Sequence, residues 1–210
     1  SDGTCTVSPA MNNGPLVVDD NAAYLWWKIA DGTETTITVT PNATTDTAVT
    51  VAEFSGVVTT SVVDGQNSTT ISNTSGTTTD PTTITTTTNG ALIVAIAALG
   101  RTPGSVDPLP TGLAWSNSVT ARVNANTGST SSSFARQYVN QGDLIQAAAG
   151  GISTVATWTN PMLNRQHLII AFKAAATGTD APAGVATGAG AASDGVAQDS
   201  PSAPATTGTG

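Results

Sequence analysis

Residues 91–99 read ALIVAIAAL, a run that contains no charged residue and no turn residue. Because successive side chains of a strand point to opposite faces, an extended segment of this composition is apolar on both faces. The run is far shorter than the roughly 20 apolar residues that a membrane helix needs, so we expect no membrane insertion. Residues 91–99 therefore predict the central strand of a buried sheet.

The sequence on either side of this run repeats short segments of Val, Ile, Thr and aromatic residues, separated by Gly, Pro, Asn and Asp. No segment carries the i, i+3, i+4, i+7 apolar spacing of an amphipathic helix. This pattern is typical of an all-β protein and favours an antiparallel β-sandwich of the jelly-roll or immunoglobulin-like kind. The expected strands cover residues 16–18, 23–30, 35–40, 48–55, 61–63, 82–88, 91–99, 113–123, 132–139, 152–158 and 167–173.

Composition divides the chain into three parts. Residues 1–21 are expected to form an N-terminal arm that could add an edge strand, and residues 22–175 the sandwich domain. Within that domain, the Ser/Thr/Asn-rich stretch of residues 64–90 predicts a long exposed loop or a ragged sheet edge. Residues 176–210 contain no aromatic residue, Leu or Ile, and predict a flexible tail or linker, because they bury too little apolar surface to offset their ordering entropy. Any order in this tail would require something to hold it, and a partner subunit is the simplest expectation.

The charge balance restricts the partners of the protein. The chain has 6 basic and 14 acidic residues, and its net charge of −8 opposes binding to nucleic acid. Only 10% of its residues are charged. Charged side chains are depleted where protein surfaces pack together, so this composition suits a subunit of a large assembly.

Residues that usually carry chemistry are scarce. The single histidine, His167, opens the apolar segment HLIIAF and is interpreted as a strand-end side chain. With Cys5 the only cysteine, no zinc site or intrachain disulfide is indicated. Glu34 and Glu53 are the only glutamates, and no surrounding motif marks them as a catalytic pair. The sequence thus predicts no catalytic residue, no metal site and no cofactor.

The aromatic residues allow a binding role. Trp26 and Trp27 are adjacent and should point to opposite faces of one strand, so one should be buried while the other is exposed or at an interface. Trp26, Trp27 and Tyr138 are the aromatic residues that could bind a glycan or a subunit. Core and subunit contacts are the favoured interpretation.

Residues 50–57 read TVAEFSGV and place a glutamate inside a strand-like run. Strand alternation puts Val51 and Glu53 on one face and Phe54 on the other, so Phe54 is expected in the core. Glu53 is expected to close a strand end or a subunit contact. An unpaired buried carboxylate is costly, so we expect it to pair with backbone N–H groups or with one of three arginines. These are Arg101, Arg122 and Arg136.

The order of six segments resembles the jelly-roll or immunoglobulin-like domain of tailed-bacteriophage virion proteins, over about residues 22–175. The segments are YLWWKIADGTETTITVTPN (24–42), AVTVAEFSGV (48–57), NGALIVAIAALG (89–100), LPTGLAWSNSVTARVN (109–124), STSSSFARQYV (129–139) and HLIIAFKAA (167–175). Glu53, Phe54, Gly56 and Trp115 mark this pattern. Such domains often have further strands before the aromatic one, and here only residues 1–21 precede it.

The resemblance implies a non-enzymatic structural protein on the virion surface, of the capsid-decoration, head-fibre or minor-tail type. Its implied partners are other virion proteins and further copies of itself. Two alternatives remain open. One is a carbohydrate-binding module that attaches to a host-surface glycan, and the other is a glycoside hydrolase on a jelly-roll scaffold.

Overall fold

The computed structural model describes residues 5–17, 22–41, 47–101, 109–127, 137–175 and 186–190. Of these, residues 5–6, 16–17 and 186–190 are described by their backbone alone. All regular elements in the described ranges are β-strands, and their pairings are antiparallel. The predicted all-β, antiparallel β-sandwich is therefore confirmed.

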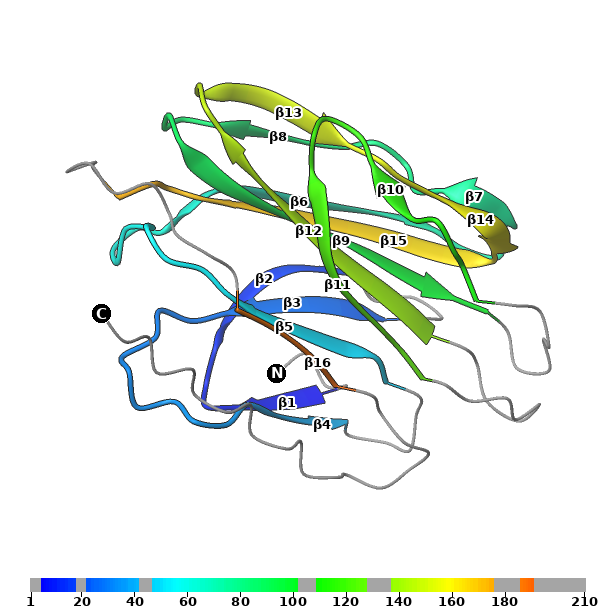
Figure 1. Cartoon of the computed structure of the whole chain (residues 1–210), viewed down its shortest axis with the longest axis horizontal. Coiled ribbons are helices and arrows are strands. Elements are labelled where there is room, and N and C mark those ends of the chain that lie inside the picture. Colours follow the sequence, from blue (N-terminus) through cyan, green and yellow to red (C-terminus); the bar gives the residue numbers. More distant parts are fainter. Residues whose placement is uncertain are drawn as a thin grey trace, which may run out of the picture.

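A five-stranded sheet forms the middle of the molecule (Figure 1). In spatial order its strands are β11 (Thr120–Asn126), β12 (Gln137–Gln146), β9 (Ala91–Gly100), β15 (Asn164–Phe172) and β6 (Val63–Ile71). β9 is the central strand, as residues 91–99 predicted, and all but one of its residues are buried. β15 pairs with β9 along its whole length and is buried at every position.

Three two-stranded sheets lie on one side of the central sheet, the lower side in Figure 1. They pair β2 (Asn12–Val17) with β3 (Ala23–Trp27), β5 (Val49–Glu53) with β16 (Ala186–Gly190), and β1 (Cys5–Ser8) with β4 (Thr38–Pro41). On this side, Val94 of β9 and Ile170 of β15 share a buried apolar cluster with Leu25 of β3. The N-terminal arm thus supplies two strands of this layer.

The opposite side of the central sheet carries two further small sheets. One pairs β8 (Thr82–Thr86) with β13 (Gly150–Thr154), and the other joins β10 (Ala114–Trp115), β14 (Ala156–Met162) and β7 (Gly76–Thr78). Ile93 and Ile169 of the central sheet pack here against Ile84 of β8 and Ile152 of β13. Because both faces of the central sheet are covered, the apolar side chains of β9 and β15 are buried on both faces.

The predicted long loop at residues 64–90 is wrong, because β6, β7 and β8 lie within or overlap this stretch. The alternative, a sheet edge, fits β6, which is the outermost strand of the five-stranded sheet. β6 gains its order from pairing with the buried strand β15 rather than from an apolar face of its own. Its polar side chains bond across to β8: Asn67 Nδ2 donates to the Thr83 carbonyl at 3.0 Å, and the Thr69 and Thr82 hydroxyls lie 2.8 Å apart. Threonine thus has two roles at this edge: its β-branched side chain favours the strand, and its hydroxyl forms the polar contacts.

The predicted strand at residues 132–139 overlaps β12 at residues 137–139. β12 begins at Gln137, and residues 128–136 lie outside the described part of the chain. The strand continues through the polar residues Asn140, Gln141 and Asp143, which are buried. Each has a partner, because Asn140 accepts from Trp115 Nε1 at 2.8 Å, Gln141 from the Thr50 hydroxyl at 3.3 Å, and Asp143 from the Arg122 guanidinium. These partners come from distant segments, so the sequence pattern did not extend the predicted strand past residue 139.

Candidate functional site

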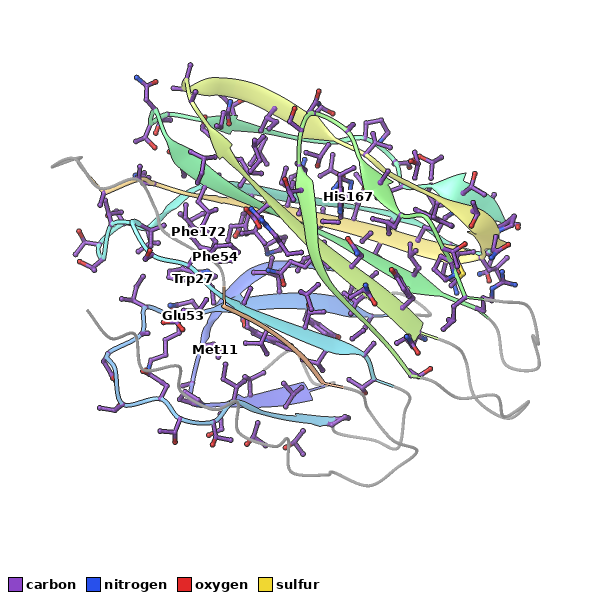
Figure 2. The ribbon with its side chains drawn as sticks, viewed as in Figure 1. Met11, Trp27, Glu53, Phe54, His167 and Phe172 are labelled. Carbon is purple, nitrogen blue, oxygen red and sulfur yellow. The ribbon has the colours of Figure 1, made fainter. Side chains whose placement is uncertain are left out.

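The TVAEFSGV segment spans the end of β5 and the turn that follows it. Phe54 packs against the core beneath the central sheet, as predicted. Figure 2 shows its ring close to Trp27 and Phe172, whose ring centroids lie 5.7 Å apart in an edge-on contact. Phe54 therefore anchors the end of β5 to the central sheet.

Glu53 is the last residue of β5 and is exposed. The expectation that it pairs with Arg101 or Arg122 is wrong. Arg122 binds the buried carboxylate of Asp143, and Arg101 donates to the Pro161 carbonyl at 2.6 Å. Arg136, the third arginine considered, lies outside the described residues. Glu53 consequently faces solvent at the side of a strand edge.

Gly56 lies in the segment that follows β5, where residues 173–175 run alongside it. Its φ is 80°, a left-handed conformation, and its carbonyl accepts a hydrogen bond from Ala175 N at 2.8 Å. Val58 N donates to the Lys173 carbonyl at 3.0 Å, and Val57 forms a bridge with Ala174. The segment that leaves β15 is thus bound along the segment that follows β5.

We expect Gly56→Ala to lower the free energy of unfolding by about 1–2 kcal/mol, because a Cβ is disfavoured at this φ. Urea denaturation measures the change. Gly151→Ala is the matched control, since a Cβ there meets nothing within 4 Å. Equal stability of the Gly56→Ala variant and the wild type would contradict the role of this turn.

Residues 186–190 of the tail form β16, which pairs with the edge of β5. The register runs from Ala186 opposite Glu53 to Gly190 opposite Val49. The expected flexible tail is therefore wrong for this segment, which is held by a strand of the same chain. The remaining tail residues, 176–185 and 191–210, lie outside the described part of the chain.

The β5 edge, meaning residues 49–53, has the properties of a strand-accepting site. Its backbone provides the pairing, and Glu53 is its single charged residue. Val51 is 38% exposed, while Thr50 on the other face bonds to Gln141 of the central sheet. An edge of this kind binds an extended segment through main-chain hydrogen bonds, with little demand on the side chains of its partner.

His167 lies within β15 and is completely buried, so it is not the strand-end side chain that the sequence suggested. Its Nδ1 lies 3.1 Å from the Asp80 carbonyl, and its Nε2 lies 2.9 Å from the Thr154 hydroxyl. A carbonyl only accepts, so Nδ1 carries the proton and Nε2 accepts from Thr154. Burial lowers the pKa of His167, although the Asp80 carbonyl partly opposes this effect. The neutral ring therefore links β15 to the layer above it through hydrogen bonds.

The aromatic residues considered for glycan binding do not converge. Trp26 stacks on Tyr24 with ring centroids 5.4 Å apart, whereas Trp27 faces the core. Tyr138 is buried on the opposite side of the central sheet, and this burial raises its pKa. Trp115, the fourth residue of the family-like pattern, packs in that same region and donates to Asn140. Sequence alternation separated Trp26 from Trp27 correctly, but it could not place Tyr138.

An open, polar depression of about 310 Å³ lies beside the segment that follows β3. It is lined by Ser8, Pro9, Lys28, Thr33, Glu34, Thr35, Thr36 and Thr38. Lys28 forms an ion pair with Glu34, and Glu34 also accepts from Asp31 N at 3.1 Å. The charges of the depression therefore satisfy one another.

Within the described ranges, no three His, Cys, Asp or Glu side chains lie close enough together to hold a metal ion. The same part of the chain contains no helix that is long and apolar enough to cross a membrane.

No protein-family model, curated protein or solved structure matches the chain. The resemblance to virion domains therefore rests on the sequence pattern.

Proposed function

We propose that the chain is a non-enzymatic structural subunit of a larger assembly, which acts through its β5 edge. The observation that carries this proposal is the pairing of β16 with β5. A low-complexity segment that adds a strand to a rigid sandwich is a means of linking subunits, because the main chain supplies the affinity. Together with the sequence pattern, it favours a decoration, head-fibre or tail component on the surface of a tailed-phage virion.

Surface chemistry supports a packing role. Only 10% of the residues are charged, and the exposed positions of β6 and β8 are Gln, Asn and Thr. Such side chains lose less solvation free energy at an interface than Lys or Glu do. Other virion proteins and further copies of the chain are the proposed partners.

The two alternative functions have less support. A hydrolase needs two carboxyl groups, or His167 with a nucleophile, in a site that substrate can reach. His167 is buried among threonine hydroxyls, and Glu34 is held by Lys28 and the backbone of Asp31. A carbohydrate-binding face needs several exposed rings side by side. Here Trp26 stacks on Tyr24, Trp27 faces the core, and Tyr138 is buried on the opposite side of the central sheet.

Cryo-electron microscopy of particles released from the natural host tests the proposal. We expect the chain to appear as repeated density on the particle surface, and mass spectrometry to find it in the purified particle fraction. Particles from a strain with an in-frame deletion of the gene are the control and should lack that density. Recovery of the chain only from the soluble fraction, with unchanged particles from the deletion strain, would overturn the proposal.

A further inference from the structure

The two ends of the connection between β15 and β16 lie close together along the same segment. Ala175 bonds to Gly56, and Ala186 pairs with Glu53, only three residues earlier along the same segment. Three extended residues span about 10 Å. The intervening residues 176–185 number ten, and ten extended residues can span about 33 Å. The connection is therefore about three times longer than the path to its own β5 requires.

The pairing itself does not depend on which copy supplies the strand. Residues 186–190 read ATGAG and offer the edge mainly backbone groups. A second copy can supply the same five residues in the same register and form the same main-chain hydrogen bonds. Gly188 and Gly190 also add conformational entropy to the unpaired strand, which weakens the pairing in either arrangement and eases release of the strand.

We propose that β16 is exchanged between copies, so that residues 186–190 of one chain complete the β5 edge of a second chain and the reverse. Reciprocal exchange closes a symmetric dimer, and one-directional exchange links copies into a ring or a row. This inference deepens the proposed function and rests on it for its biological setting. The exchange itself is a property of the isolated chain.

Concentration decides between the two pairings. A short flexible connection gives the cis strand an effective concentration in the millimolar range, so dilute protein keeps its own β16. Packing of subunits into an assembly brings the local concentration of neighbouring strands into the same range. The strand segment carries no charge and the β5 edge carries only Glu53, so no specific charge repulsion opposes exchange.

Cysteine crosslinking between differently tagged full-length chains tests the exchange. Val51 and Gly188 are directly opposite in the β5–β16 register. Directly opposed strand residues have Cβ atoms about 4.5–5.5 Å apart, close to disulfide range. One chain carries Cys5→Ser and Val51→Cys, and the other carries Cys5→Ser and Gly188→Cys. The two are mixed at high concentration, taken through mild urea and back, and oxidised.

We expect a disulfide-linked heterodimer on a non-reducing gel, confirmed by peptide mass spectrometry. In the matched control, Ala52→Cys replaces Val51→Cys and moves the thiol to the other face of β5. The heterodimer yield should exceed that of the control by roughly tenfold, because a misdirected Cβ prevents disulfide formation.

Two results would overturn the exchange. In the first, Val51→Cys and Gly188→Cys combined in one chain form the internal disulfide, while the mixed chains form no more heterodimer than the control. In the second, neither the internal nor the intermolecular disulfide forms, which would also refute the β16 register. Failure of the proposed function is seen separately: a chain that exchanges strands yet is absent from particles would refute the virion role and leave the exchange intact.

Discussion

The wild-type protein is expected to lose stability as the pH falls below about 6.5, and His167→Gln is expected to remove most of that loss. Burial lowers the pKa of His167 in the folded chain below its ordinary value of 6.5. The unfolded chain therefore takes up a proton first as the pH falls. The stabilisation is fully present above about pH 6.5 and is lost toward the lower folded pKa, by at most about 1.4 kcal/mol per pH unit.

Glutamine is a suitable replacement because it is neutral at every pH and retains one donor and one acceptor for the Asp80 carbonyl and the Thr154 hydroxyl. Urea denaturation at a series of pH values between 4.5 and 8 measures the effect in both proteins. Hydrogen bonds from Thr87 and Thr88 outweigh the effect of burial and lower the pKa of Asp64 below 3.8. Its contribution is lost only at lower pH, so it does not overlap this window.

Parallel stability curves for the wild type and His167→Gln between pH 4.5 and 6.5 would contradict the assignment of His167 as a buried neutral ring. They would also mean that β15 and the layer above it separate in a way that admits water to the ring. A steeper loss in the wild type alone confirms that the ring is sealed between the two layers.

Ile169→Ala is expected to lower the free energy of unfolding by about 2–5 kcal/mol. Ile169 is fully buried between the central sheet and the β8–β13 pair, where it packs with Ile93, Ile84 and Ile152. Truncation removes three buried carbon atoms and leaves a cavity that two stiff sheets cannot close. Folded domains are stabilised by about 5–15 kcal/mol in total, so this single change removes a large share.

Ile145→Ala is the matched control for this prediction. Ile145 lies on β12 of the same sheet, but its side chain is 40% exposed. The same truncation there should cost less than about 1 kcal/mol, because solvent already reaches the side chain. Urea denaturation of both variants measures the difference. Similar losses in the two proteins would mean that the β8–β13 pair does not cover the central sheet.

Apolar patterning was sufficient to predict the central part of the fold. ALIVAIAAL has no polar face, and this property alone requires a strand with cover on both sides. Alternation likewise predicted that Glu53 and Phe54 lie on opposite faces of the strand, because successive side chains point to opposite faces. These predictions depend only on the order of neighbouring residues, which the sequence gives directly.

Polar strands were beyond the reach of such patterning. β6 and the polar middle of β12 look like loop sequence, yet both are ordered, because β15, Trp115, Thr50 and Arg122 supply their hydrogen-bond partners. These partners lie up to about a hundred positions away in the sequence. The sequence could list the donors and acceptors but could not match them.

The chain's sequence by itself determined the class of the fold, its central strand and the scarcity of chemically reactive groups. Only the tertiary structure decided that His167 is sealed inside, that Glu53 faces solvent and that residues 186–190 form a strand on β5. The reason is physical: a side chain's periodicity depends on its neighbours in the chain, whereas burial and strand pairing depend on which distant edge is left open. The ATGAG segment has almost no preference of its own, so the β5 edge gives it its structure.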